Sequence, residues 1–181
     1  EGDQPFTVSD RDSKAGFVQY QGAFGSHKLQ LAGRYDDNEQ FGEHTTGNIA
    51  WGYDWNRNLG FFASYGTAFK APNFQELHIP WGGNPDLRPE KSRSFEAGLR
   101  GRVNELHWSL NAFQTDVDGL ITYLAGVANN IQEARIRGLE ASLATQVLGW
   151  TANVNVTFLD PEDRSSEYQG NQLVHRARHS A

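Results

Sequence analysis

Residues 59–72 read LGFFASYGTAFKAP, and residues 83–92 read GNPDLRPEKS. In the first stretch, large apolar residues alternate with small or polar ones, which is the period of a β-strand. The strand runs into a connection rich in proline and glycine, and a second strand is expected to begin after the corner at Pro89. This order of strand, long loop and strand predicts an antiparallel sheet.

The same two-residue period recurs in eight stretches of about nine to eleven residues, the length that a tilted strand needs to cross a bilayer core. In the clearest of them, Trp150, Val154 and Phe158 share one face, while Thr151 and Asn153 lie on the other. The chain is therefore predicted to be all-β and antiparallel, with part of a ninth strand at 175–181 and with eight strands at 14–24, 27–36, 47–54, 59–67, 92–100, 104–114, 135–146 and 149–159.

Composition supports a β-rich fold and excludes several other classes of protein. The 181 residues include 19 Gly, 11 Phe, 6 Tyr and 5 Trp but no Cys, which excludes disulfides and thiolate metal sites. The net charge of -6 comes without a Lys/Arg cluster, so no nucleic-acid partner is expected. No window approaches the roughly 18 apolar residues of a membrane helix. A mean hydropathy of -0.64 still fits a membrane barrel, because only every second residue of a strand faces lipid.

The connections between the predicted strands alternate in length. Short turns on one side and long loops on the other are typical of an outer-membrane barrel. All six prolines are expected to lie outside strands, since each strand of a barrel is hydrogen-bonded on both sides. A soluble β-sandwich also has alternating faces, so that alternative stays open, although the pattern favours a transmembrane β-barrel segment. The short connections are predicted at 25–26, 56–58, 101–103 and 147–148, and the long ones at 37–46, 68–91, 115–134 and 160–174.

The face opposite the apolar one is polar. In a barrel it would line the interior, which must hold water or another folded segment. Its charged members have two interpretations: they pair with a plug inside the barrel, or they solvate the wall. The predicted lumen residues are Gln19, Arg34, Asn48, Ser64, Glu96, Arg100, Asn111, Glu140, Asn153, Asn155 and Thr157.

Five motifs resemble those of the TonB-dependent outer-membrane receptors, and the resemblance extends from about Arg11 to the C-terminus. Within that family the chain is most similar to the vitamin B12 (cobalamin) receptors, and the YDDNEQFG motif is the most cobalamin-like of the five. The motifs are YDDNEQFG at 35–42, SYGTAFKAPN at 64–73, GNPDLRPEKS at 83–92, ARIRGLEA at 134–141 and LVHRAR at 173–178.

The resemblance implies transport and not an enzyme. It implies uptake across the outer membrane of a large nutrient, cobalamin in first place, by a receptor that is surrounded by outer-membrane lipid and contacts TonB through its N-terminal region. It also implies a barrel of about 22 strands around a plug. Residues 1–181 are then expected to form a partial barrel without the plug domain or the closing strands. Two alternatives stay open: a ferric-siderophore receptor of the same family, and a small self-contained barrel that serves as an enzyme or adhesin.

Candidate ligand contacts lie in the longest predicted loop and near the end of the chain. Segment 73–84 is rich in aromatic and amide side chains, with a short helix expected at 73–78, and such groups suit a large corrinoid rimmed by amides. The alternative for this loop is packing on its neighbours. The resemblance adds a basic pair that approaches the ligand in the family, and the first position of that pair departs from the family pattern here. The predicted binding residues are Phe74, His78, Trp81, Asn84, His175 and Arg176.

Carboxylates are dense at 36–39 and at 160–163, and oxygen ligands of this kind suit Ca²⁺. Neither segment matches the calcium loops of the cobalamin receptors, so solvated acidic loops and no metal site are expected. No cofactor is expected either, because the sequence contains no P-loop, no Gly-rich dinucleotide motif and no Ser/His/Asp arrangement.

Overall fold

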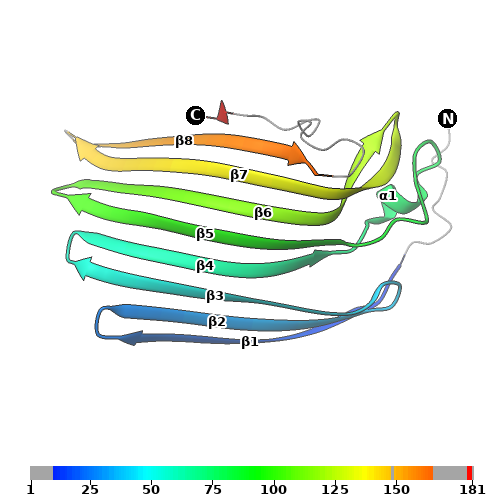
Figure 1. Ribbon diagram of the computed structural model, residues 1–181, viewed down its shortest axis with the longest axis horizontal. Helices are drawn as coiled ribbons and strands as arrows, with labels where there is room; N and C mark the ends of the chain where they lie inside the picture. Colours follow the sequence, from blue (N-terminus) through cyan, green and yellow to red (C-terminus); the bar gives the residue numbers. More distant parts are fainter. Residues whose placement is uncertain (1–9, 148, 165–178, 181) are drawn as a thin grey trace.

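The computed structural model describes residues 10–147, 149–164 and 179–180, which form one antiparallel sheet and one short helix. The strands pair in chain order from β1 to β9, so that consecutive strands lie side by side across the sheet (Figure 1). No helix in this part of the chain is long and apolar enough to cross a membrane. The elements are β1 (Ser13–Phe24), β2 (His27–Asn38), β3 (Gly42–Asn56), β4 (Leu59–Lys70), α1 (Phe74–His78), β5 (Glu90–Val103), β6 (Leu106–Leu124), β7 (Val127–Val147), β8 (Trp150–Asp163) and β9 (His179–Ser180).

One face of the sheet, called the apolar face below, collects the large apolar side chains of the eight predicted strands. Trp51, Leu110 and Val154 on this face keep 42%, 47% and 54% of their surface exposed. A soluble sandwich would cover these side chains with a second sheet, and the described residues form no such layer. The predicted all-β, antiparallel fold is confirmed, and its apolar face is built for contact with hydrocarbon.

The opposite face, called the polar face below, carries the predicted lumen residues. Ser64 pairs across strands with Glu96, Asn111 with Glu140, and Ser142 with Asn155, so polar groups of neighbouring strands stand together. Because side chains alternate strictly along a strand, the registered pairing carries this polarity from strand to strand, with Phe62 and Phe113 as apolar exceptions.

The apolar zone runs obliquely across the paired strands. One cross-strand row is apolar or aromatic on β1 to β5 and polar on β6 to β8. At the other end of the zone, β1 itself ends at Phe24, whereas β8 carries apolar residues three rows farther, to Trp150. A flat hydrocarbon layer cut by tilted strands produces this offset, since barrel strands tilt by about 35–45°. The row consists of Tyr20, Leu31, Ile49, Tyr65, Phe95, Gln114, Arg137 and Asp160.

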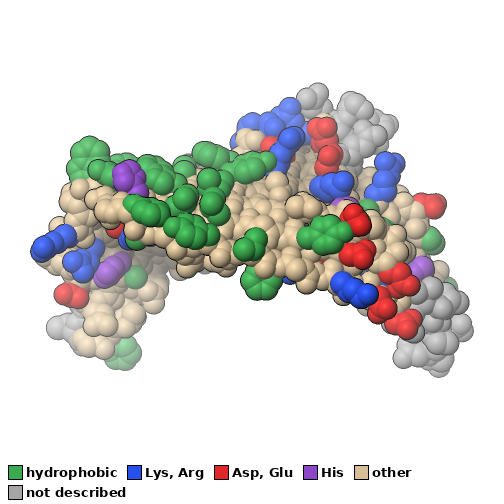
Figure 2. Space-filling model, turned by 90° about the horizontal axis from the view of Figure 1, so that it is seen from below, with side chains coloured by type: hydrophobic (Ala, Val, Ile, Leu, Met, Phe, Trp, Pro, Cys, Tyr) green, Lys and Arg blue, Asp and Glu red, His purple; other side chains and the backbone are tan. Residues whose placement is uncertain are grey.

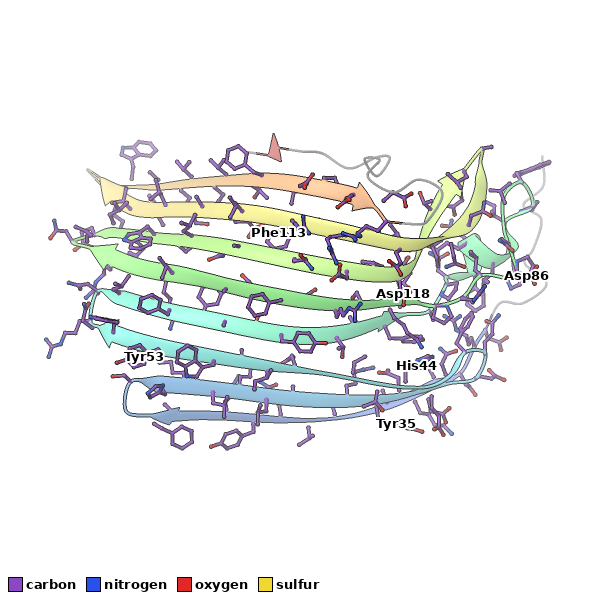
Figure 3. All side chains as sticks on the ribbon, viewed as in Figure 1. Tyr35, His44, Tyr53, Asp86, Phe113 and Asp118 are labelled. Carbon is purple, nitrogen blue, oxygen red and sulfur yellow. The ribbon has the colours of Figure 1, made fainter. Side chains whose placement is uncertain are left out.

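Side chains of different kinds gather at the two ends of the sheet. Hydrophobic side chains gather toward the short-turn end, while most acidic and basic side chains lie toward the long-loop end (Figure 2). Aromatic side chains mark both limits of the apolar zone, with Tyr53 toward the short turns and Tyr35 toward the loops (Figure 3). At the short-turn end, Trp51 and Tyr53 stack with ring centroids 6.2 Å apart. This is the arrangement of the aromatic girdles of membrane barrels.

The strands continue farther at the loop end than the sequence predicts. β6 and β7, of 19 and 21 residues, form one long hairpin that turns at Ala125-Gly126, so the predicted loop at 115–134 is wrong. The predicted loop at 37–46 is likewise mostly strand, closed by a turn at 39–41, and the short turn predicted at 101–103 lies at 104–105. These extensions project beyond the apolar zone. That of β2 and β3 is polar on both faces, whereas that of β6 and β7 carries apolar residues that pack in a small cluster of their own, so the regular alternation of hydrophobicity disappears.

Pro161 is an exception to the predicted placement of prolines. It lies inside β8 across from Ile136, so the expectation that all six prolines lie outside strands is wrong at this position. Within the described residues, β9 pairs with β8 only at Thr157 and Phe158. Pro161 thus lies where one side of β8 is an edge, which is where a strand tolerates a residue without an N–H group.

Buried apolar residues form two small clusters at the loop end. Leu77, Leu87 and Ala128 form the first, with Phe41 and Ile121 packed against it. A second cluster joins β6 and β7 and consists of Leu120 and Ala134 with Val117 and Ile136 against them. The loops are therefore held by their own cores, outside the membrane-facing wall.

Candidate functional site

The connection between β4 and β5, residues 71–89, begins with helix α1. Asn73 caps the helix, because its side chain accepts from the backbone N–H of Glu76 at 2.8 Å and the Glu76 carboxylate accepts from the N–H of Asn73 at 2.8 Å. This reciprocal capping box satisfies two N–H groups that a five-residue helix would otherwise leave open. The short helix predicted at 73–78 is thus confirmed.

The capping carboxylate is also part of an ion-paired group. Nζ of Lys70, at the loop end of β4 and beyond the apolar zone, lies 3.3 Å from Glu76 and 2.9 Å from Glu90. Burial acts to lower the pKa of Lys70, but hydrogen bonds and charge from Glu90 and Glu76 outweigh it and raise this pKa above its ordinary value. Glu90 also accepts from the backbone N–H of Ile121 at 3.1 Å. The base of the loop is therefore tied to both flanking strands.

The rest of the connection packs on the β6–β7 hairpin. The side-chain amide of Asn84 donates to the carbonyl of Ala128 at 3.0 Å, and the N–H of Ala128 donates to the carbonyl of Gly82 at 2.8 Å. A Cβ at Gly82 would overlap the carbonyl oxygen of Gly126, so only glycine allows this close approach of the two backbones. These contacts attach the loop to the edge of the β6–β7 hairpin near its tip.

Arg11 connects the same loop to the start of the described chain. Its guanidinium donates to the carbonyl of Pro72 at 3.0 Å. The same group lies 5.4 Å from the ring centroids of both Phe41 and Phe74. A cation between two aromatic faces is a favourable contact, and here it joins the β2–β3 turn to α1.

The structure brings some of the predicted binding residues together and gives others a different role. Phe74 and His78 stack on successive turns of α1, with ring centroids 6.5 Å apart. Trp81 projects from the loop with 88% of its surface exposed. The Asn84 side chain is engaged within the protein, since it also accepts from the N–H of Asp86 at 3.0 Å. His175 and Arg176 lie outside the described residues.

Sequence reasoning missed Arg11 and Phe41 as members of this loop group. Both come from segments far from α1 in the chain, and no local spacing relates them to Phe74. Three successive segments in fact meet here: the turn after β2, the α1 connection and the β6–β7 hairpin. The group presents aromatic and amide side chains, and within it the charge of Lys70 is paired with those of Glu76 and Glu90.

The polar face carries a second group near the short turns. Asp54 lies 2.6 Å from Nζ of Lys28 and 3.4 Å from Nη2 of Arg100. A hollow of about 760 Å³ adjoins it, lined also by Arg102 and His107. Arg100 thus lies on the predicted lumen face and has an ion-pair partner within the wall itself. This arrangement suits contact with a polar segment or solute inside a barrel.

Neither group assembles a metal site. Within residues 10–147, 149–164 and 179–180, no three His, Asp or Glu side chains come close enough to hold a metal ion. In the acidic segment at 36–39, Asp36 forms an ion pair with Arg34 at 2.7 Å, and Glu39 accepts from the N–H of Asp12 at 3.0 Å. The described groups offer hydrogen-bonding side chains and aromatic surfaces.

Comparison with known proteins relates this architecture to one family. Residues 2–181 match the family model described as TonB dependent receptor-like, beta-barrel. The chain is 32% identical over 187 residues to the vitamin B12 transporter BtuB of Photobacterium profundum, covering 97% of this chain and 30% of that protein. It is 33% identical over 175 residues to BtuB of Vibrio cholerae serotype O1, covering 94% and 28%. The chain thus spans about 30% of the length of these relatives.

Solved structures show the same fold at lower identity. The siderophore receptor PirA from Acinetobacter baumannii superposes with a TM-score of 0.77 at 19% identity, covering 96% of this chain and 31% of that one. At 19% identity, the superposition shows a shared fold and gives no information about the ligand. The family match agrees with the apolar and polar faces, the oblique hydrophobic zone and the long loops. The chain therefore belongs to the TonB-dependent receptor β-barrel family, whose members lie in the outer membrane of Gram-negative bacteria.

Proposed function

We propose that the whole protein takes up cobalamin through the outer membrane in a TonB-dependent manner. The observation that carries this proposal is the 30–33% identity to vitamin B12 transporters along 94–97% of the chain. Solved structures that resemble the chain include siderophore receptors and iron transporters at 14–22% identity and a copper transporter at 19%. Binding and passage, and not catalysis, would be the activity.

The chemistry of the loops supports a ligand rimmed by amides. The α1 connection exposes Trp81 and the stacked pair Phe74 and His78, while the charges of Lys70 and Glu76 are paired with each other. Flat aromatic surfaces and hydrogen-bonding groups suit a corrinoid. A strongly anionic complex would instead be served by a cluster of unpaired basic side chains, and this connection presents none among its described residues apart from Arg88.

The chain itself would supply part of the barrel wall and several extracellular loops. A wall of about 22 strands closes around a plugged lumen. The Asp54 group on the polar face would then meet the plug or the passing solute. Energy would come from TonB, through a region of the receptor outside this chain.

Uptake by living cells tests the proposal. The full-length gene is expressed in a Gram-negative strain that lacks its own cobalamin receptor, with and without TonB, and uptake of labelled cyanocobalamin is measured. We expect uptake that requires both the gene and TonB and that a ferric siderophore in excess leaves unchanged. Uptake of the ferric siderophore without uptake of cyanocobalamin would assign the receptor to iron instead.

A further inference from the structure

The apolar face has a hollow on the part formed by β5 to β8. Its floor is the cross-strand pair Ala97 and Ala112, whose methyl groups leave space between larger neighbours. Phe95, Leu139 and Phe158 line its sides, and its volume is about 500 Å³. In a wall that faces lipid, an apolar depression of this kind has the shape and the chemistry to hold part of an acyl chain.

Basic side chains begin at the loop end of this hollow. Arg137 is among the lining residues, and its Nε donates to Gln114 at 3.1 Å. Gln114 donates in turn to Asp116 at 3.0 Å, and Asp116 accepts from Arg135 at 2.5 Å. This series of hydrogen bonds orients the Arg137 guanidinium through one nitrogen. Its two terminal nitrogens have no hydrogen-bond partner in the described part of the chain, so they are available to an anion.

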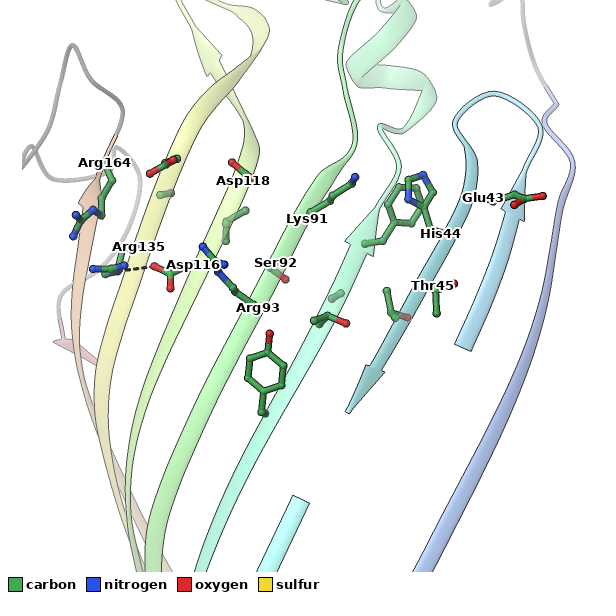
Figure 4. Close-up of a pocket in the computed structure, with 18 residues that line it drawn as sticks. Glu43, His44, Thr45, Lys91, Ser92, Arg93, Asp116, Asp118, Arg135 and Arg164 are labelled. Atoms are coloured by element: carbon green, nitrogen blue, oxygen red, sulfur yellow. Dashed lines mark hydrogen bonds and ion pairs between the residues drawn. The ribbon is translucent and has the colours of Figure 1, made fainter. Parts of the chain in front are cut away.

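An adjoining hollow of about 590 Å³ is lined by Arg93 and Lys91, together with Arg135 and Arg164, which each have a carboxylate partner (Figure 4). Arg93 lies across the strand pair from Asp116, whose carboxylate is already engaged by Arg135. Neither Arg93 nor Lys91 forms an ion pair with any carboxylate of the described residues, although Asp118 lies across from Lys91. Asp118 and its own cross-strand neighbour Glu133 lie one row farther toward the loops than Arg93.

The guanidinium groups of Arg93 and Arg137 lie on either side of Gln114. Arg93 on β5 and Arg137 on β7 are separated by two strand spacings and by an offset of two residues along the strands, about 12 Å in all, and both side chains are long enough to reach an anion above Gln114. Asp160 lies across from Arg137 in the register of β7 and β8, on the side of Arg137 that faces away from Arg93. Guanidinium groups bind phosphate oxygens through paired, charge-assisted hydrogen bonds. A phosphate at this position would lie directly at the loop end of the apolar hollow.

We propose that the wall binds one phosphate-bearing lipid of the outer leaflet at this place. An acyl chain occupies the hollow over Ala97 and Ala112, and the phosphate lies between Arg93 and Arg137. The apolar hollow and the basic side chains follow the order of acyl chain and phosphate in the outer leaflet. The long loops of such barrels are extracellular, and the basic side chains lie at the loop end of the hollow, where the phosphates of that leaflet are. The site is independent of the nutrient that the receptor carries.

Binding of lipid A to the full-length receptor in detergent tests the site. Native mass spectrometry counts retained lipid for lipid A with both phosphates and for the same lipid after their enzymatic removal. Arg93→Gln and Arg137→Gln remove the phosphate donors, and Ala97→Trp fills the hollow. The matched controls are Arg102→Gln on the polar face and Ala152→Trp on the apolar face at the short-turn end of β8.

The wild type and both controls are expected to retain one phosphorylated lipid and to bind the dephosphorylated lipid at least tenfold more weakly. Each arginine variant should weaken binding of the phosphorylated lipid about tenfold. Ala97→Trp should weaken both lipids while the barrel keeps its heat-dependent gel mobility. Equal retention of the two lipids by the wild type would overturn the proposal. Retention by the arginine variants at the wild-type level, or equal losses in the controls, would overturn it as well.

Discussion

Trp108 lies directly across the β5–β6 pair from Gly101, and its indole occupies the space that a side chain at Gly101 would fill. The ring thus covers bare backbone on the apolar face, close to the short-turn end. An aromatic residue opposite a strand glycine is a recurrent way to shield such backbone. The adjacent His107 lies on the polar face, across from Arg102.

Trp108→Asp should prevent assembly of the barrel, whereas His107→Asp should be tolerated. The first change removes the indole from Gly101 and places a charge against hydrocarbon, which destabilises the barrel by roughly 2 kcal/mol or more. The second adds a charge to a face that already carries Arg100 and Arg102. The measurement is the amount of full-length receptor in the outer-membrane fraction. Equal amounts for the two variants would contradict the assigned facing.

Gly82→Ala should detach the α1 connection from the β6–β7 hairpin. The added methyl overlaps the carbonyl oxygen of Gly126, and overpacking of this kind destabilises by about 1–3 kcal/mol. Gly16→Ala is the control, because a methyl there meets nothing within 4 Å. Limited proteolysis of intact cells that express the receptor measures the outcome. Faster cleavage within 71–89 is expected in the Gly82 variant alone, and unchanged cleavage would show that the contact does not hold the loop.

Asn73→Ala should loosen α1 without unfolding the wall. Loss of the capping side chain costs about 1 kcal/mol, because the N–H of Glu76 loses its acceptor. Hydrogen exchange at the amides of Glu76 and Leu77 should become about fivefold faster. Gln75→Ala, at an exposed position of the same helix, serves as the matched control and should leave both rates unchanged. Protection equal to the wild type in the Asn73 variant would refute the role of the cap.

Trp81→Ala should weaken cyanocobalamin binding by roughly tenfold if the exposed indole contacts the ligand, as exposed aromatic anchors commonly do. Trp150→Ala removes an equally exposed tryptophan, 79% accessible, from the opposite end of the sheet and should leave binding unchanged. Binding of labelled cyanocobalamin to whole cells compares the two. Identical affinities would remove Trp81 from the binding surface while leaving the proposed ligand open to the uptake experiment.

The facing of the wall was predictable because it depends on a strict local period. Trp51, Leu110 and Val154 lie on the predicted face, since alternation assigns each strand residue a side without any knowledge of its partners. The limits of the strands were not predictable in this way. Residues such as Asp116 and Arg135 belong to strands that extend beyond the hydrocarbon, where hydrogen bonding continues but hydrophobic alternation does not.

The loop site was predictable only in its local parts. The cap at Asn73 and the neighbours Phe74 and His78 follow from helical spacing. The role of Asn84 does not, because its amide is engaged by Ala128, 44 positions away, in a contact that no sequence spacing shows. Arg11 is similar, since its carbonyl partner at Pro72 lies 61 positions away.

The hydrogen bond between Ala128 and Gly82 joins the α1 connection and the β6–β7 hairpin into one unit at the loop end of the sheet. In the proposed receptor, a solute that arrives from outside would not displace the connection alone, because Ala128 donates a hydrogen bond to Gly82 and also packs in one buried cluster with Leu77 and Leu87. Under that proposal, entry would require either that the connection and the hairpin move together about the bases of β6 and β7 or that the solute passes on the other side of the pore.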